Sequence, residues 1–184
     1  AYLWGLPLIQ KKQDEALVGR VSNYFSQINE NSLSSKIEFI ADNGGEDTFA
    51  LDVSGLWVLE PNEDSISFTF FSKVSSIGSA AWVSLTGVDC PPTANGVIGI
   101  HKPSVICARA DTLADGYNIT YKIWFRQLNE SGGARSYKIK LLNYQNPGSL
   151  TAVTSTGKSV RIFRGSINTT TQNLITTEIK ILFG

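Results

Sequence analysis

The feature that most constrains the fold is a strict alternation of apolar and polar residues in two segments, 117–127 and 173–184. Successive side chains of a β-strand point to opposite faces, so this period of two predicts strands with one buried face. In the first segment the apolar face consists of Tyr117, Ile119, Tyr121, Ile123 and Phe125. In the second segment it consists of Ile175, Thr177, Ile179, Ile181 and Phe183. Both segments are therefore predicted to be long, half-buried strands.

Shorter runs rich in β-branched and aromatic residues extend this pattern along most of the chain. They lie at residues 36–41, 48–53, 56–59, 65–74, 81–85, 97–100, 105–108, 136–144 and 160–165. Turn-forming pairs such as Pro61-Asn62, Asp115-Gly116 and Asn146-Pro147 separate them. Many short strands punctuated by turns are typical of a sandwich or a barrel. We therefore predict an all-β fold, an antiparallel β-sandwich of the immunoglobulin-like or jelly-roll kind.

One region departs from the strand pattern. From Asp14 to Ile28 the apolar residues recur at spacings of three and four, which predicts one short N-terminal helix. Gly19 weakens that helix by roughly 1 kcal/mol, and residues 20–28 also fit a strand. A chain of 184 residues is long enough to bury one substantial core. Residues 14–184 are therefore predicted to form a single β-sandwich domain.

Residues 1–13 are predicted to form a separate apolar arm. Its apolar side chains include Tyr2, Leu3, Trp4, Leu6 and Leu8. Pro7 confines such a segment to an edge strand or an extended arm. The arm must be buried, either on its own sandwich or in a neighbouring subunit as an inter-subunit strand. Pro7 counts against the second alternative, because proline cannot donate to a strand ladder.

The stretch AVTSTGKS, residues 152–159, fits the spacing of a phosphate-binding loop. Such a loop needs a strand before it and a helix that begins at the Lys-Ser pair. Here a turn precedes the stretch, and the alternation of Val160 and Ile162 predicts a strand after it. We therefore predict a hairpin turn at Thr156-Gly157 and no nucleotide cofactor.

Other catalytic chemistry lacks the residues it needs. His101 is the only histidine, so any nucleophilic triad must use it, and it is predicted to be a loop residue. Zinc in its usual coordination lacks enough ligands, and no pair of carboxylates is singled out for glycoside chemistry. The turn with Asp42, Glu46 and Asp47, like the acidic turn at 60–64, offers oxygen ligands to calcium, but a solvated polar turn is favoured. We therefore expect no metal, no cofactor and no enzymatic activity.

Charge and hydropathy exclude two further classes of partner. The formal net charge is zero, so the chain offers no basic patch to a nucleic acid. No apolar run approaches the roughly 20 residues that a membrane-spanning helix needs. We expect neither nucleic-acid binding nor membrane insertion.

The two cysteines indicate the cellular compartment in which the protein folds. Cys90 and Cys107 are the only two, and the chain has no Met and begins at Ala1, as expected of an exported protein whose signal peptide has been removed. An even pair in such a protein predicts one disulfide; two free thiols in a cytosolic protein are the alternative. We therefore expect an extracellular or cell-surface location.

The tryptophans provide the candidate binding residues. Trp57 and Trp82 lie in apolar runs and are predicted to be core. Trp124 lies on the polar face of its strand, beside Lys122 and Arg126. An exposed aromatic ring among polar groups suits sugar stacking or a protein hot spot, so these three residues are predicted to bind a ligand. A second sheet packed over that face would bury the ring instead.

A neutral, Thr- and Asn-rich β domain of this kind is typical of surface attachment and assembly. Its composition and alternation resemble the immunoglobulin-like pilins and tip adhesins of bacterial fimbriae, in which strands can be donated between subunits. This resemblance implies a non-enzymatic adhesin or filament subunit. The partners it implies are a host-surface glycan or protein receptor and copies of itself or sister subunits.

The alternative is viral. The stretch YLWGLP, residues 2–7, is similar to the Leu-Trp junction at which adenovirus fibre shafts pass into their heads. This similarity implies a viral capsid or trimeric fibre-head domain that binds a host receptor.

Overall fold

The computed structural model describes residues 2–78 and 80–184, with the side chains of residues 9–78 and 80–184. Helices α1 (Tyr2–Tyr24) and α2 (Leu33–Asn43) precede the strands. The strands are β1 (Glu46–Ala50), β2 (Leu56–Glu60), β3 (Ser65–Ser72), β4 (Val83–Ser84), β5 (Gly96–Val97), β6 (Ser104–Thr112), β7 (Tyr117–Phe125), β8 (Leu128–Asn129), β9 (Ser136–Asn143), β10 (Val153–Ser155), β11 (Ser159–Thr169) and β12 (Leu174–Phe183). The mostly-β prediction is confirmed.

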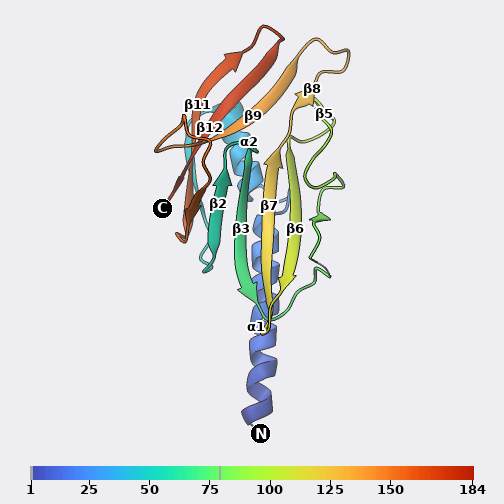
Figure 1. Ribbon diagram of the computed structural model, residues 1–184, viewed down its shortest axis with the longest axis vertical. Helices are drawn as coiled ribbons and strands as arrows, with labels where there is room; N and C mark the ends of the chain where they lie inside the picture. The colour runs from blue at the N-terminus through green and yellow to red at the C-terminus, as the bar shows by residue number, and fades with distance from the viewer. Residues whose placement is uncertain (1, 79) are drawn as a thin grey trace.

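The strands form two six-stranded sheets that pack together, which confirms a β-sandwich at this level of description. One sheet has the order β1-β11-β12-β9-β8-β5 and the other β10-β2-β3-β7-β6-β4. Figure 1 shows the second sheet facing the viewer, with α1 behind it and running out beyond its lower end. Helix α2 lies against β1, β11 and β12 of the first sheet.

Trp57 on β2 is the centre of the core. Its side chain is fully buried, and its ring lies 4.7 Å from that of Phe68 on β3. It also meets Phe25 directly after α1, Phe49 on β1 and Phe183 on β12, with ring centroids 6.0 to 6.2 Å away. Trp57 therefore joins both sheets and α1 in one apolar core, as predicted for this residue.

The alternation in the two long segments is confirmed. On β7 the side chains of Ile119, Tyr121 and Ile123 are buried in the core, while Asn118, Thr120 and Lys122 are only partly buried. On β12 the buried side chains are Thr177, Ile179 and Ile181, again every second residue. The inner face of each sheet is therefore the apolar face that the sequence pattern predicted.

The N-terminal region differs from the prediction. An arm over residues 1–13 and a helix from Asp14 to Ile28 were expected, but α1 is one helix of 23 residues from Tyr2 to Tyr24. The predicted inter-subunit strand is therefore wrong as secondary structure. The expectation rested on Pro7, because proline is disfavoured within a helix, but Pro7 lies in the second turn of α1. The side chains of Tyr2, Leu3, Trp4, Leu6 and Leu8 lie outside the described ones.

The strand predicted at residues 36–41 is also wrong, because these residues belong to α2. The Ser32 side chain accepts a hydrogen bond from the Ser35 amide (3.3 Å) and caps the helix, which ends at Gly44 with a φ of 82°. The buried residues Leu33, Ile37 and Ile40 follow a helical spacing of three and four. Six residues alone looked like a strand because they are rich in Ile and Phe; the eleven-residue pattern shows the helix.

The strand pairing corrects two further details. Every pairing in the β7-containing sheet is antiparallel, but β12 pairs with β9 in parallel and so does β5 with β8. The predicted hairpin at Thr156-Gly157 is wrong, because β10 pairs with β2 whereas β11 pairs with β1 in the other sheet. The Thr156-Gly157 segment therefore connects the two sheets. Gly157 lies so close to the carbonyl of Gly184 that a Cβ would collide with it.

Asp64 holds the two sheets together at one end of the sandwich. It follows β2 in a turn, has a φ of 51°, and is buried, with 4% of the residue exposed. Its Oδ1 accepts a hydrogen bond from the Leu141 amide on β9 (3.0 Å), and its Oδ2 pairs with Lys138 Nζ (2.9 Å). Its carbonyl accepts from the Phe125 amide (2.9 Å) at the end of β7. One residue thus contacts β7 in one sheet and β9 in the other.

Replacing Asp64 is expected to weaken the sandwich. Asp64→Ala should lower the free energy of unfolding by about 2–4 kcal/mol, because it leaves the buried Leu141 amide unpaired and removes the partner of Lys138. Asp64→Asn keeps an acceptor oxygen and tolerates the positive φ, so its loss should be smaller. Urea unfolding measures both. The exposed Asp115→Ala serves as the control and should change stability by less than about 0.5 kcal/mol; equal effects at the two positions would contradict this role of Asp64.

Candidate functional site

The outer face of the β7-containing sheet carries a small apolar cluster of its own. Val105, Cys107 and Trp124 are buried there, and Trp82, Val88 and Cys90 pack on them from the long segment between β3 and β6. Cys90 and Cys107 form a disulfide with a Cα–Cα distance of 6.3 Å, as predicted. The bridge links this segment, called the tied segment below, to β6. It holds the segment over the outer face of the sheet, where the polar side chains of β7 lie.

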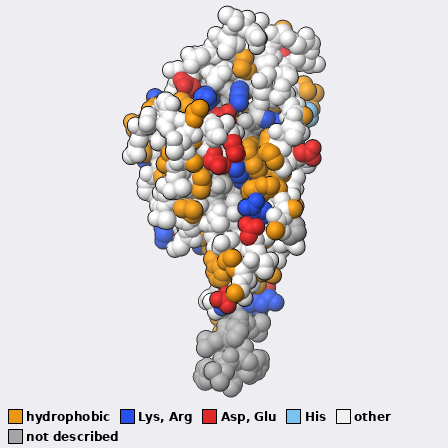
Figure 2. Space-filling view, viewed as in Figure 1, with side chains coloured by type: hydrophobic (Ala, Val, Ile, Leu, Met, Phe, Trp, Pro, Cys, Tyr) orange, Lys and Arg blue, Asp and Glu red, His pale blue; other side chains and the backbone are white. Residues whose placement is uncertain are grey.

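A groove of about 580 Å³ lies between β7 and the tied segment. Its lining comes from the turn after β2, the tied segment, β7 with the residues after it, and β9. The lining residues are Glu63, Trp82, Pro91, Pro92, Thr93, Ala94, Asn95, Lys122, Trp124, Phe125, Arg126, Gln127 and Lys138. Figure 2 shows acidic and basic side chains gathered over the middle of this sheet, next to hydrophobic ones. A volume of this size is typical of small-molecule sites.

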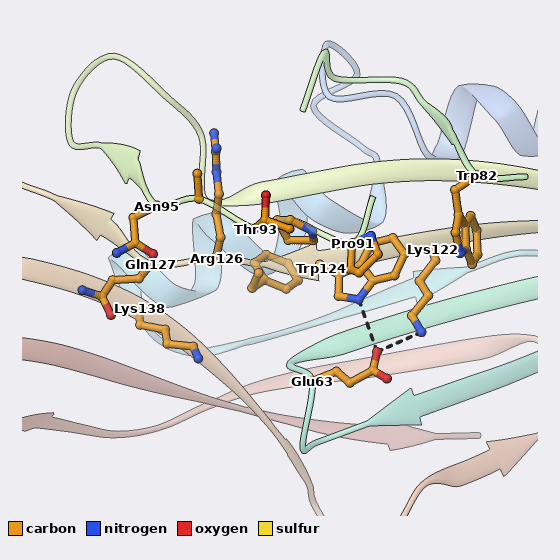
Figure 3. Close-up of a pocket in the computed structure, with 13 residues that line it drawn as sticks. Glu63, Trp82, Pro91, Thr93, Asn95, Lys122, Trp124, Arg126, Gln127 and Lys138 are labelled. Carbon is orange, nitrogen blue, oxygen red and sulfur yellow. Dashed lines mark hydrogen bonds and ion pairs between the residues drawn. The ribbon is translucent and has the colours of Figure 1, made fainter. Parts of the chain in front are cut away.

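Glu63 is the hub of the polar groups at one end of the groove. Lys122 Nζ lies 3.0 Å from Glu63 Oε2 and 2.6 Å from Glu60 Oε2, and Trp124 Nε1 donates to Glu63 Oε2 at 3.2 Å. Figure 3 shows Lys122 and Trp124 both directed at Glu63. Partial burial alone would raise the pKa of Glu63, but the hydrogen bond and charge of Lys122, with the hydrogen bonds of Trp124 and Ser65, hold that pKa below its ordinary value.

Arg126 differs from the other two cations of the groove. Lys122 is paired with Glu60 and Glu63, and Lys138 with Asp64. Among the described residues, no carboxylate lies within ion-pair distance of Arg126. Its Nη2 donates a long hydrogen bond to the Lys102 carbonyl (3.4 Å), and its buried Nε has no partner among the described residues. Burial lowers the pKa of its guanidinium.

The structure brings the three predicted binding residues together, since Lys122, Trp124 and Arg126 all line the groove. The ring of Trp124 is only 5% exposed, however. Trp82 packs on it edge to face (5.3 Å between centroids), and Lys122 Nζ lies 4.8 Å above its ring. The tied segment, not a second sheet, covers it. Trp82, predicted to be core, is instead half-buried in this outer cluster; the binding role of the three residues stays a prediction.

The remaining predicted positions lie elsewhere. His101 is an exposed loop residue, as predicted, and its Nδ1 accepts from the Val97 amide (2.9 Å). Asp42 belongs to the last turn of α2, whereas Glu46 and Asp47 begin β1, and Asp47 pairs with Lys36 (3.0 Å). Within the described residues these carboxylates are not part of any group that could hold a metal ion. In the phosphate-loop-like stretch a strand, not a helix, begins at Ser159.

A separate hollow of about 260 Å³ is lined by Glu38, Asp42 and His101 among others. Burial raises the pKa of Glu38, against the opposing effects of Ser104 and Lys102, and burial also raises that of Asp42. Both carboxyls lie one turn apart on α2 and approach the hollow from the same side. Glycoside hydrolysis needs two acids that flank the scissile bond, so this pair does not have the arrangement that the reaction requires.

Sequence patterns did not predict most of the residues that line the groove. Glu63 and Lys138 come from a turn and from the other sheet, and residues 91–95 come from a segment with no regular structure before β5. One signal was present: the predicted disulfide draws that segment to the face of the sheet on which Cys107 lies, and the structure shows this to be the outer face.

The comparisons give no relative. No protein-family model, no curated protein and no solved structure matches this chain. Within the part of the chain that the structure describes, neither helix combines the length and the apolarity needed to cross a bilayer. The buried disulfide indicates folding in an oxidising environment, such as the extracellular space.

The pKa of Glu63 should respond to Lys122. In Lys122→Met, the pKa of Glu63 should rise above its value in the parent chain, because its main counter-charge is gone. A carboxyl with a lowered pKa adds stability above its ordinary pKa and loses it as the pH falls through the lowered value, so this mutation should also reduce the destabilisation of the chain by acid. NMR titration of the Glu63 side-chain carboxyl measures the change.

Lys158→Met is the matched control, because Lys158 pairs with Asp52 (2.8 Å) outside the groove and lowers the pKa of that carboxyl. It should shift Asp52 and leave Glu63 unchanged. An identical Glu63 titration in Lys122→Met and the parent chain would disprove the assignment.

Proposed function

We propose that this chain is a non-enzymatic extracellular or cell-surface β-sandwich that acts as an adhesin or filament subunit. It binds a host-surface glycan or protein through its β domain and assembles with copies of itself or sister subunits through α1. The sandwich is of the immunoglobulin-like or jelly-roll kind, with a helix as its assembly element. The observation on which the proposal depends is the extension of α1 beyond the sheets (Figure 1).

Among the side chains of α1 that the structure describes, those that pack on the sandwich belong to its C-terminal half. Asp14 Oδ2 accepts a hydrogen bond from the Lys73 amide (2.6 Å), and Val18 and Val21 are buried in the core. The side chains of residues 9–13, by contrast, are all exposed, and that of Ile9 is 56% exposed. An apolar side chain such as Ile9 is left in contact with water there, so burial against a partner would stabilise this part of the helix.

Copies of the same chain are the partner that fits best. Residues 1–9 are almost wholly apolar in sequence, and the next turns carry both signs of charge, with Lys11 and Lys12 followed by Asp14 and Glu15. A helix surface with both signs can pair with another copy of itself, and apolar helix faces associate by burying their surface together. A helix thus takes the role that the sequence had suggested for an extended strand.

Two other features support the proposal. The disulfide suits a protein exposed to an oxidising environment, and the groove on the outer face supplies a place for a ligand. The viral alternative is less well supported, because a bridged cysteine pair is less expected in a virus that assembles in the cytoplasm.

Self-association should depend on α1. A chain that lacks residues 1–13 should lose self-association. Its far-ultraviolet circular dichroism spectrum should still show a folded β-sandwich, because the sheets and the buried part of α1 remain. Ile9→Glu in the complete chain should weaken self-association about tenfold or more, because it places a charge on the contact surface. Sedimentation equilibrium over a range of concentrations measures both effects.

Ile167→Glu is the matched control, because Ile167 is 52% exposed on β11 and lies away from α1. It should leave the association constant unchanged. A complete chain that stays monomeric at all concentrations, or one that associates equally well as Ile9→Glu, would contradict the proposal; binding of such a monomer to lipid vesicles would assign α1 to a membrane surface instead.

A further inference from the structure

We infer that the groove between β7 and residues 91–95 binds a carboxylated saccharide, with the guanidinium of Arg126 as the anchor of the ligand's carboxylate. This inference rests on the binding part of the proposed function and names its ligand class. The charges, the lining and the position of the groove each support this ligand class.

The charged side chains of the groove are paired unequally. Its two lysines have carboxylate partners at 2.6 to 3.0 Å, so they contribute little net attraction to a ligand. Arg126 is the cation without such a partner among the described residues, and it is half-buried. Figure 3 shows its side chain extending away from Glu63, the acid of the groove. A guanidinium in this state is stabilised by a planar anion that accepts two hydrogen bonds, which a carboxylate does.

The other lining groups match a sugar. Thr93, Asn95 and Gln127 offer a hydroxyl and two amides, the groups that hydrogen-bond to sugar hydroxyls. Trp82 and Pro91 offer apolar surface to the C–H faces of a sugar ring. The mixture of apolar surface and a few polar groups is typical of small-ligand sites.

The position of the groove disfavours an acidic peptide and a nucleic acid. Strand β7 is central in its sheet, paired with β3 on one side and β6 on the other, so an extended peptide cannot add to it as a strand. A nucleic acid would need several free cations, and the groove offers Arg126 with both lysines already paired.

The groove is also held in shape before a ligand arrives. The Cys90–Cys107 bridge fixes the segment next to Pro91, and the Trp82–Trp124 contact fixes it against β7. A Cβ at Gly96 would lie 3.1 Å from Arg126 Cζ and 2.5 Å from Leu128 Cδ2, so the backbone packs tightly beside the guanidinium. A rigid site loses less conformational entropy when a ligand binds.

The test is a calorimetric titration of the complete chain with four probes: tetragalacturonic acid, its methyl ester, 3′-sialyllactose and lactose. The acids should bind about tenfold or more tightly than their neutral counterparts, because only they place a carboxylate on Arg126. The two acids distinguish a uronic from a sialic source. Binding of neither acid, or equal binding of acid and neutral forms, would overturn the inference.

The variants locate the site. Arg126→Gln should lower the affinity for the acid about tenfold, to that of the neutral form, and Arg126→Lys should lower it less, since it keeps the charge but loses the paired hydrogen bonds. Arg161→Gln, which removes an exposed arginine stacked on Phe163 (5.0 Å), is the matched control and should bind like the parent chain. Near-ultraviolet circular dichroism, dominated by the tryptophans, verifies that each variant is folded.

Unchanged acid binding in folded Arg126→Gln would overturn the inference, as would a preference for an Asp- and Glu-rich hexapeptide over both saccharides. The chain that lacks residues 1–13 separates this inference from the proposed assembly, because it retains the groove. If it binds the acid but the complete chain never associates, the assembly proposal fails alone; if the complete chain associates through α1 but binds no acid, the ligand inference fails alone.

Discussion

The buried carboxylate of Asp64 is the interaction on which both the sandwich and the groove depend. Asp64 lies in a tight turn of one sheet and accepts a hydrogen bond from the Leu141 amide of the other sheet. It also forms an ion pair with Lys138. The positive φ of this residue is tolerated by Asp better than by most side chains, so turn geometry and inter-sheet contact require the same amino acid. Because Lys138 lines the groove, the same bond neutralises one of the groove's cations.

The outer face of the β7-containing sheet is organised separately from the main core. Its cluster of Trp82, Trp124 and the disulfide lies on the opposite side of the sheet from Trp57. Closing a loop across a sequence separation of 17 residues contributes about 3 kcal/mol by restricting the unfolded chain, and here it also fixes the wall of a groove. The chain thus uses one core to fold and a second, smaller one to shape a surface.

Much of the fold was predictable because local patterns report local geometry. The alternation of residues 117–125 correctly placed Tyr121 in the core and Lys122 outside it, and the even pair of cysteines correctly gave the disulfide. The parallel pairing of β9 with β12 was not predictable, because it depends on which distant strands meet, and the local pattern is the same for either direction. Helix α2 was missed because residues 36–41, taken alone, favour a strand through their Ile and Phe content, while the caps that define the helix lie outside them.

The candidate site was predictable only in the part that one strand supplies. Lys122, Trp124 and Arg126 share a face of β7 and its extension, so their proximity follows from a period of two. Glu63, Lys138 and residues 91–95 reach the same place through a turn, the other sheet and a disulfide, and no local pattern relates them. The exposure of Trp124 could not be read from its strand either, because burial depends on what the tied segment places above it.

The most direct test of the account is a crystal structure of the chain with a carboxylated saccharide bound. We expect the sugar in the groove between β7 and residues 91–95, with its carboxylate within hydrogen-bonding distance of the Arg126 guanidinium. The groove walls should keep the positions that they have in the ligand-free structure. A saccharide bound elsewhere on the chain, or one in the groove with its carboxylate turned to solvent and a neutral hydroxyl on Arg126, would contradict the account.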